Sequence, residues 1–509
     1  MRVRDYFEGK HIFITGGSGF VGKVLIEKLL RSCPSLSKIY MLIRTKKGKS
    51  VQERLDAILK LPLYDKLRET NPDVLNKIHA IGGDVMVLNL GMSEEDRRLV
   101  VENCHIIYHS AASVRFDDSL KDAIIMNVRG TRETAALALQ CQNLEAFMHI
   151  STTFCNVDRD IIEEKMYPAR ADWRDAIQLA EEMDEMQLQA MSLQYISPHP
   201  NTYTFAKSLA EHTVEDMLLG KLPTIIFRPS VVISNISEPM VGWNDNFNGP
   251  VGLLAAGGKG LLRTVYGSRD SIQDYISCDV VAKLVILATK ETLMHKNLNE
   301  IVVYNASKYK YIPCTTGEII DMGAESIWDR PYEQILWYPW FKMTACWYDF
   351  YIKVLVYHML PAVFLDLMMR VAGMKPMIFK VQRKIFIANV VLFHFVSHTW
   401  QFLNDRTMAL EKAIEDDRDK EDFGFSSFLH MPKRQVYEYF RDSKVGTAKY
   451  LFKEKCDFVR NRKNIWRLYV VDRIFWTAFY GAILWYLFVR LDTLSVLWNS
   501  LCNYVERLE

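Results

Sequence analysis

The sequence predicts an α/β fold with a doubly wound parallel sheet, followed by an α-helical C-terminal domain and a C-terminal membrane segment. Through the first half of the chain, short apolar runs alternate with helical patterns. Near residue 345 the composition shifts toward Trp, Tyr, Met and Phe, and an apolar run without a charge lies close to the C-terminus. Because strands separated by helices are typical of parallel sheets with helices on both faces, we expect such a sheet in the first half.

Seven segments are predicted to be strands because they are short apolar runs between turns or helical patterns. They are residues 11–14, 38–43, 77–82, 104–109, 146–150, 224–227 and 301–304. Helical patterns lie between them near residues 50–60, 93–102 and 117–142. The stretch 156–200 is polar and helical in its middle, so we expect it to be an insertion over the functional site and not a core element.

The most informative motif is the glycine-rich run TGGSGFVG, residues 15–22, which follows the first predicted strand and opens into a helical pattern. Three spaced glycines there allow a tight turn, the approach of a pyrophosphate to bare backbone, and close packing of the helix on the strand. The first amides of the helix and its dipole attract phosphate. A Rossmann dinucleotide site is therefore predicted at Gly16, Gly17, Ser18, Gly19, Phe20 and Gly22.

The end of the second strand predicts which dinucleotide binds. Arg44 lies 25 residues past Gly19, where a carboxylate would bind the ribose hydroxyls of NAD, and Lys46 and Lys47 follow it. A guanidinium can instead pair bidentately with a 2′-phosphate. The pattern favours NADPH as the cofactor, with Arg44 and Lys47 as its contacts; the alternative is a solvated basic loop.

The other residues predicted to bind the cofactor follow later strands. Asp84 is placed to accept a hydrogen bond from an adenine amino group, and small residues follow the fourth strand where the cofactor would cross the sheet edge. Arg228 and Pro229, past the sixth strand, are expected to border the nicotinamide. The full set is Asp84, Val85, Ala111, Ala112, Asn127, Arg228 and Pro229.

Tyr203 and Lys207 form the predicted catalytic pair. At positions i and i+4 they share one helix face, where the ammonium is expected to lower the pKa of the phenol toward working pH. A third member is expected to be a hydroxyl at the end of the fifth strand. Ser151, Thr152 and Thr153 all qualify, and Thr152 is our choice.

The C-terminal tail predicts membrane attachment. Residues 474–489 carry no charge, and at about 1.5 Å per residue this run is slightly short of a bilayer core. Seven basic and three acidic residues precede it in 453–473, against two basic and three acidic in 490–509. Because positive residues favour the cytosolic side, the body is expected to face the cytosol. Residues 494–505 are a candidate second, interfacial piece.

Composition excludes several classes of protein. The net charge of +2 does not suggest a nucleic-acid partner, and the N-terminus has no apolar signal region. The nine cysteines form no CxxC pair, so we expect reduced thiols and no metal site. The apolar run 354–365 is too short to span a membrane. It is compatible with a core helix, a helix that contacts lipid, or a lining for an acyl chain.

Together these sites resemble extended short-chain dehydrogenase/reductases. Four longer segments, residues 41–55, 109–131, 242–263 and 357–376, resemble the alcohol-forming fatty acyl-coenzyme A reductases of animals. The resemblance implies an NADPH-binding reductase domain over 1–345, a helical C-terminal domain over 346–460 and a membrane-associated tail over 465–509. It also implies reduction of a long-chain acyl-CoA by two NADPH to a fatty alcohol and free coenzyme A.

Two other functions remain open from the residues alone. One is a membrane-bound sterol or hydroxysteroid dehydrogenase on the same fold, and the other is a membrane scaffold that binds NADPH without catalysis. The tail favours the endoplasmic reticulum, with the peroxisome and the lipid droplet as alternatives. Chain length of the substrate and oligomeric state are not predicted.

Overall fold

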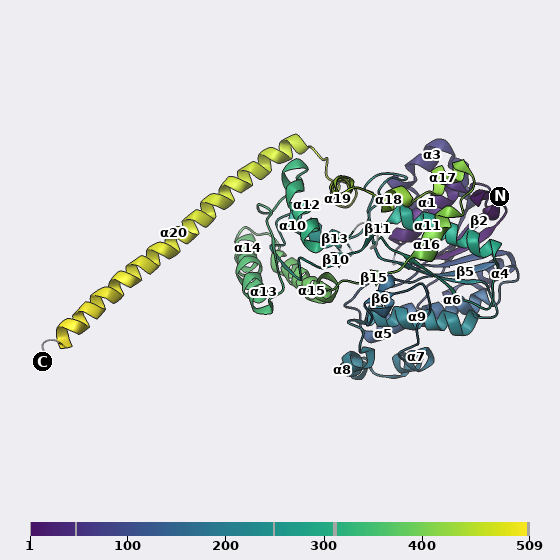
Figure 1. Ribbon diagram of the computed structural model, residues 1–509, viewed down its shortest axis with the longest axis horizontal. Coiled ribbons are helices and arrows are strands. Elements are labelled where there is room, and N and C mark those ends of the chain that lie inside the picture. Colours follow the sequence, from purple (N-terminus) through teal and green to yellow (C-terminus); the bar gives the residue numbers. More distant parts are fainter. Residues whose placement is uncertain (1, 46–47, 248–249, 309–312, 506–509) are drawn as a thin grey trace.

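A computed structural model describes residues 2–45, 48–247, 250–308 and 313–505. The N-terminal half forms an α/β body, a group of mostly C-terminal helices lies beside it, and one long helix, α20, projects away (Figure 1). The two termini therefore lie at opposite ends of the molecule (Figure 1).

The centre of the body is a parallel sheet of seven strands in the order β12-β7-β5-β4-β1-β2-β3. The sequence prediction of a doubly wound parallel sheet is confirmed, and each of the seven predicted runs supplies one strand. The strands are β1 (His11–Thr15), β2 (Lys38–Ile43), β3 (Ile78–Gly82), β4 (Ile106–His109), β5 (Ala146–Ile150), β7 (Thr224–Pro229) and β12 (Val302–Ala306). The order reverses between β1 and β4, which is where such sheets bind ligands.

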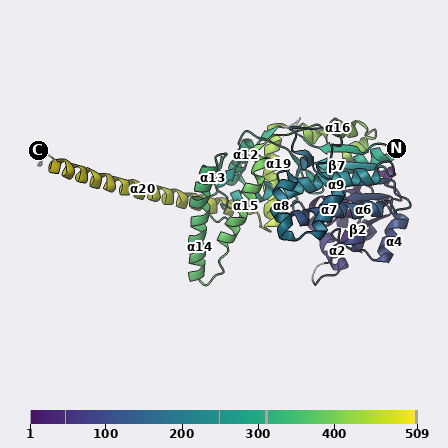
Figure 2. The same ribbon diagram turned by 90° about the horizontal axis from the view of Figure 1, so that it is seen from below.

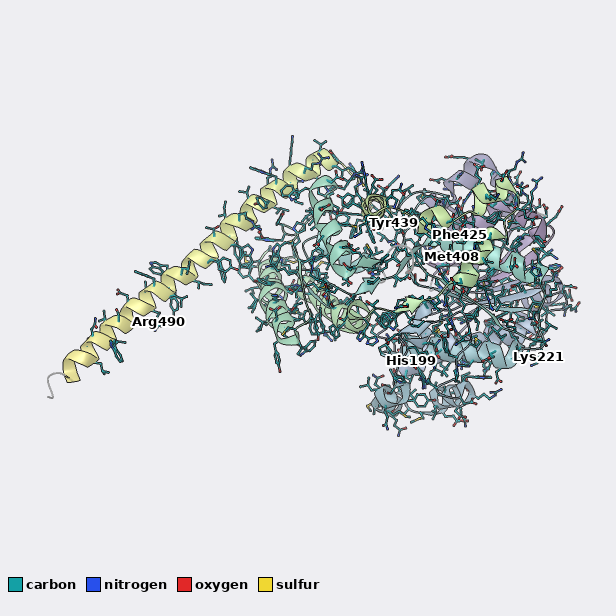
Figure 3. All side chains as sticks on the ribbon, in the orientation of Figure 1. His199, Lys221, Met408, Phe425, Tyr439 and Arg490 are labelled. Atoms are coloured by element: carbon teal, nitrogen blue, oxygen red, sulfur yellow. The ribbon has the colours of Figure 1, made fainter. Side chains whose placement is uncertain are left out.

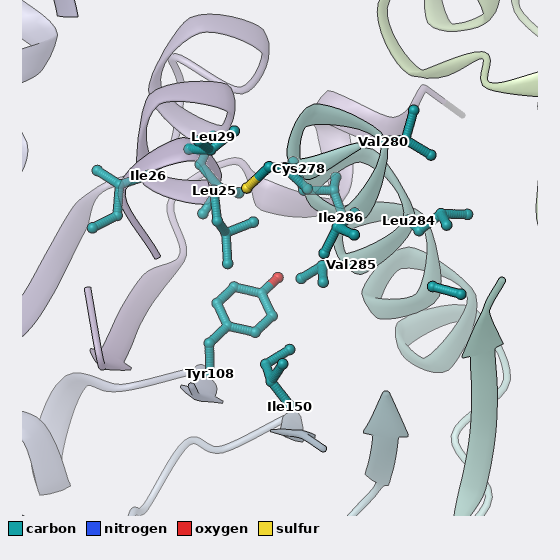
Figure 4. Close-up of a cluster of buried hydrophobic side chains, with 14 of the residues drawn as sticks. Leu25, Ile26, Leu29, Tyr108, Ile150, Cys278, Val280, Leu284, Val285 and Ile286 are labelled. Carbon is teal, nitrogen blue, oxygen red and sulfur yellow. The ribbon is translucent and has the colours of Figure 1, made fainter. Parts of the chain in front are cut away.

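Helices cover both faces of the sheet and bury its apolar side chains. On one face α1 (Phe20–Ser32) packs against α11 (Cys278–Met294). The hydroxyl of Tyr108 on β4 reaches into this layer and lies 2.9 Å from the Thr289 hydroxyl, among the leucines and isoleucines of both helices (Figure 4). On the other face lie α4 (Glu94–Asn103), α6 (Gly130–Ala138) and α9 (Thr202–Leu218). Shorter helices fill the connections: α2 (Val51–Leu59), α3 (Asp65–Thr70), α5 (Leu120–Ala123), α16 (Asp405–Lys412), α17 (Asp417–Phe423) and α18 (Ser426–Leu429).

The structure of the segment 156–200 differs from what its sequence predicts. It contains β6 (Ile161–Ile162), α7 (Trp173–Glu182) and α8 (Glu185–Ile196), and the two helices lie outside α9 as an extra layer (Figure 1). Trp173 and Ile177 repeat at helical spacing and are buried against α5 and α9. The prediction that this segment is no core element was wrong, because its charged residues concealed an apolar stripe.

The second group of helices begins with α10 (Pro250–Gly258) and α12 (Thr316–Asp329) and ends with α19 (Lys433–Gly446). Between them α13 (Trp347–Val354), a π-helical turn and α14 (Leu360–Val371) form one continuous helix, and α15 (Ile378–Ser397) returns beside it. The run 354–365 looked too short to span a membrane, but the helix that contains it has 25 residues and is long and apolar enough to cross one.

The helix α20 (Phe458–Val505) is also long and apolar enough to cross a membrane. Asp472 and Arg473 do not interrupt it, because the Asp472 carboxylate is buried and accepts a hydrogen bond of 2.5 Å from the Trp337 indole. Phe475 and Trp476 still contact Trp337 and Trp340. Further along the helix the side chains project away from the body, as at Arg490 (Figure 3).

Gly22 tests the packing of α1 on the glycine turn. A Cβ at Gly22 would lie 2.4 Å from the Gly16 carbonyl oxygen and 2.7 Å from the Gly17 Cα. We expect Gly22→Ala to lower the free energy of unfolding by about 1–3 kcal/mol and to weaken nucleotide binding, because backbone must shift. Thermal unfolding and nucleotide titration of the full chain in detergent measure both effects.

The matched control is Gly323→Ala on α12. A Cβ there meets side chains only at 3.8 and 4.0 Å, so we expect unchanged or slightly raised stability. Equal unfolding temperatures for the two variants would contradict the close packing at Gly22.

Candidate functional site

The glycine turn joins β1 to α1 at the point where the strand order reverses. Gly16 has a φ of +73°, and a Cβ there would lie 2.6 Å from both the Ala111 nitrogen and the Ser110 carbonyl carbon. Only glycine fits, because the turn lies against the chain that leaves β4. No side chain caps the start of α1, whose N-cap is Gly19, so its first amides are free to face a phosphate. The cradle fits the pyrophosphate of a dinucleotide.

The remaining turn residues differ in what they present. Gly17 is buried beneath the Met41 side chain, whereas Ser18 is partly exposed. The Phe20 ring stacks on Trp243 at 5.4 Å, and Lys23 pairs with Asp245. The loop that carries Trp243 therefore covers the start of α1, and Phe20 is left to contact a cofactor through its backbone.

Arg44 lies just past the end of β2 with its side chain exposed. Among the described residues it has no carboxylate partner within ion-pair distance, so its guanidinium is available to an anionic group. Lys46 and Lys47, which were predicted beside it, lie outside the described residues.

The side chains of the polar residues predicted after β3 and β4 mainly hydrogen-bond to nearby backbone. The Asp84 carboxylate accepts a hydrogen bond of 3.0 Å from the Met86 amide, and Val85 is buried in the core. Asn127 accepts a hydrogen bond of 2.9 Å from the Ser113 amide and donates one of 3.2 Å to the Ser113 carbonyl. It thereby fixes the segment that follows Ala111 and Ala112, both of which are partly exposed.

Tyr203 lies in the first turn of α9, which begins where the Asn201 side chain accepts the Thr204 amide at 2.9 Å. Its phenol lies beside the side chain of Thr152, just past the end of β5. Burial raises the pKa of Tyr203 above its usual value, and the nearby Thr152 side chain offsets part of that rise. The structure thus brings Thr152 and Tyr203 together, and the phenol holds its proton at neutral pH.

Lys207 lies one turn further along α9. Its ammonium donates a hydrogen bond of 2.7 Å to the Ile150 carbonyl, the last residue of β5. Burial lowers the pKa of Lys207 to about 8, although Glu211 opposes this. The expectation that Lys207 lowers the phenol pKa is wrong in this structure: the ammonium is directed to a backbone carbonyl, and desolvation decides the pKa of Tyr203.

The other two candidate hydroxyls have different surroundings. Ser151 lies beside Glu211 and Cys155, and its buried hydroxyl has no hydrogen-bond partner among the described residues. Thr153 is fully buried at the start of a short 3-10 turn. Successive residues of extended chain point to opposite sides, which separates Ser151 from Thr152.

Arg228 lies beneath the site as half of a buried ion pair. Its Nε and Nη2 donate to the two carboxylate oxygens of Glu211 at 2.8 and 2.6 Å, and its Nη1 donates to the carbonyls of Glu163 and Lys165. Four of the five guanidinium N–H donors are thus used by protein groups and the side chain is fully buried, so it is not presented to the nicotinamide that it was expected to border. Pro229 follows it as the last, buried residue of β7.

Sequence reasoning missed Glu211, although it follows Lys207 by four residues on the same helix face. Burial raises the pKa of the Glu211 carboxyl, but Arg228 outweighs this and the net direction is down. The carboxylate therefore stays charged and opposes the loss of the Lys207 proton.

An aromatic wall beside Tyr203 was also missed. The Phe116 ring lies 5.5 Å from the Tyr203 ring and 5.0 Å from Phe395 at the end of α15. Phe154 contacts Phe395 and Trp400 edge to face. No short-range motif could reveal it, because its members come from three distant segments of the chain.

Several known proteins and two family models are similar to this chain. Two family models, both described as male sterility protein, match residues 14–285 and 357–454. Fatty acyl-CoA reductase 1 of Rattus norvegicus is 37% identical over 89% of this chain and 87% of its own length, and that of Homo sapiens is 36% identical over the same shares. Fatty acyl-CoA reductase wat of Drosophila melanogaster is 35% identical over 96% of this chain and 93% of its own length.

Solved structures match the fold. The terminal R domain of the myxalamid PKS-NRPS pathway has a TM-score of 0.55 at 19% identity, with 83% of this chain and 91% of that chain covered. A reductase domain of a nonribosomal peptide synthetase from Mycobacterium tuberculosis has a TM-score of 0.54 at 18% identity, with 83% and 92% covered. With the matching models and relatives spanning most of its length, the chain belongs to the fatty acyl-CoA reductase family.

Proposed function

We propose that this protein reduces a long-chain acyl-CoA to a fatty alcohol and free coenzyme A, in two steps, each with one NADPH. The observation that carries the proposal is that Thr152 and Tyr203 lie side by side, with Lys207 one turn away on α9 and hydrogen-bonded to the end of β5. The pair follows the carboxyl end of β5, next but one in the sheet to the strand that carries the glycine turn. Membership in the fatty acyl-CoA reductase family supports the substrate class.

The chemistry follows from where charge develops. NADPH, when bound by the glycine turn and Arg44, supplies the hydride. Negative charge then grows on the substrate carbonyl oxygen, where Thr152 and Tyr203 act as hydrogen-bond donors. The raised pKa of Tyr203 keeps a proton on the phenol, so Tyr203 can deliver it to that oxygen. In the first step the C–S bond breaks and coenzyme A leaves as thiolate; in the second the aldehyde oxygen takes the proton and becomes the alcohol.

The aromatic wall supports an apolar substrate. The Phe116 ring packs between Tyr203 and Phe395, so the surface beside the phenol is apolar. Such a wall suits an acyl chain and holds the aldehyde between the two steps, away from amines that would react with it.

We further propose that α20 anchors the protein in a membrane with the body facing the cytosol. The basic residues that precede its exposed apolar part support this orientation. The endoplasmic reticulum is the proposed location, with the peroxisome and the lipid droplet as the alternatives.

Tyr203→Phe tests the reaction. Removal of the phenol proton should lower alcohol formation at least about a hundredfold while NADPH still binds, because only the proton donor is lost. The assay is incubation of the full chain with NADPH and a ladder of acyl-CoAs, with products resolved as aldehyde or alcohol.

The control is Tyr195→Phe, a partly buried tyrosine on α8 whose ring contacts Phe205 and which lies outside the site. Its turnover should equal that of the unchanged protein. Near-normal alcohol formation by Tyr203→Phe would remove the proposed role, and NADP-dependent turnover of sterols without turnover of any acyl-CoA would contradict the substrate.

The pKa of Lys207 predicts a pH profile. Below about pH 8 the Lys207 ammonium is charged and, through its hydrogen bond to the Ile150 carbonyl, holds α9 and Tyr203 in place, whereas above that pH the charge is lost and this tie weakens. We expect kcat/KM for acyl-CoA reduction to fall as pH rises through about 8. Arginine stays charged over this pH range, so the residual activity of Lys207→Arg should not fall as pH rises through about 8. If kcat/KM of Lys207→Arg still falls as pH rises through about 8, another group is responsible for the titration.

Arg44→Ala tests the choice of cofactor. Loss of a charge-assisted contact to the 2′-phosphate should weaken NADPH binding by about 10- to 100-fold and leave NADH binding unchanged. Lys49→Ala, which removes a neighbouring exposed cation, is the matched control. Calorimetric titration with each nucleotide gives the affinities. Equal losses for NADPH and NADH would contradict a role at the 2′-phosphate.

A further inference from the structure

The helix α14 exposes an apolar stripe instead of burying it. Six large apolar side chains recur at i, i+3, i+4, i+7, i+8 and i+11, and each is between 52% and 79% exposed. They are Leu360, Val363, Phe364, Leu367, Met368 and Val371. Such spacing puts all six on one helix face, and in an amphipathic helix of a soluble body that face would lie against the core.

The stripe continues over the tip of a hairpin. The chain turns after Val371 and returns as α15, and Figure 2 shows α14 extending away from the body. The Asp366 carboxylate on α14 accepts the backbone amides of Met377, Ile378 and Phe379 at 2.9–3.0 Å, so it caps α15 and fixes the turn. The exposed Met374, Met377 and Phe379 extend the apolar surface.

Exposed cations surround this apolar surface. Between residues 360 and 384 the chain has five basic residues and one acidic residue, Asp366, which is used as the cap. The five are Arg370, Lys375, Lys380, Arg383 and Lys384, and all are exposed. Across the ranges that the structure describes, none of them forms an ion pair with a carboxylate.

We propose that this hairpin tip, residues 360–384, docks on the surface of a bilayer that contains anionic lipid. Apolar side chains interleaved with lysine and arginine are what such a surface binds: the apolar groups enter the acyl boundary, while the cations reach the phosphates and carboxylates of the headgroups. A second copy of the chain fits worse, because a two-fold contact through this patch would bring five cations against five.

Docking at the tip is separate from anchoring by α20. The far end of α15 carries Phe395, which contacts Phe116 beside Tyr203. A bilayer contact at one end of α15 would therefore add a second point of contact, which fixes the height of the aromatic wall above the lipid.

The test uses the full chain reconstituted in vesicles. A fluorescent amino acid replaces Val371, and quenching by lipids brominated on their acyl chains reports its depth. We expect strong quenching in vesicles that contain phosphatidylserine and less in phosphatidylcholine alone. Reversal of all five cations to Glu should reduce quenching at Val371 to background, because each cation contributes roughly a fivefold factor to binding an anionic surface.

The same probe at Glu95, an exposed residue of α4 at the opposite end of the body, supplies the background. Reversal of Lys66 and Arg98, two exposed cations of the body, is the charge control and should leave quenching at Val371 unchanged. NADPH titration checks that each variant is folded. If quenching at Val371 is no greater than at Glu95, the proposed docking is wrong. If quenching at Val371 persists after all five cations are changed to Glu, the surface is not recognised through its anionic lipid.

Discussion

The hydrogen bond between the Lys207 ammonium and the Ile150 carbonyl is the constraint on which the site depends. It ties α9 to the end of β5 at 2.7 Å, so that Tyr203, one turn earlier, meets Thr152. The Arg228–Glu211 pair below it keeps a carboxylate charged in the core, and this negative charge partly offsets the cost of burying the ammonium. The site is therefore held by buried charge in addition to packing, whereas the glycine turn is held by close packing and by backbone hydrogen bonds such as that from the Gly19 amide to the Gly16 carbonyl.

Sequence patterns predicted the sheet well because each strand is a short apolar run between turn signals, and parallel order follows from the helices between them. The glycine turn and the Tyr203–Lys207 spacing are likewise local. Features that join distant segments were not predictable. Phe116 contacts Phe395, which lies far from it in the sequence. The insertion 156–200 has a polar composition, yet its Trp173 is buried. The direction of the Tyr203 pKa was missed because desolvation depends on the folded surroundings and not on the nearest cation.

The two halves of the molecule divide the physical problem of an oily substrate with a charged head. The sheet provides rigid strand ends and free amides, which suit a polar dinucleotide. The C-terminal helices provide exposed apolar faces on α14 and α20, which are unfavourable in water and favourable in lipid. Between them lies the aromatic wall, in which Phe116 contacts both Phe395 of α15 and Tyr203.

The unbroken passage of α20 out of the body has a mechanical consequence. Its first turns are part of the fold, with Asn461 and Asp472 buried, and the same helix continues into the exposed apolar part without a flexible joint. A protein on a loose tether would swivel freely over the membrane. Here the orientation of the whole body is coupled to the direction of one rigid helix, so in the proposed membrane-anchored state any change in the tilt of α20 would turn the body with it.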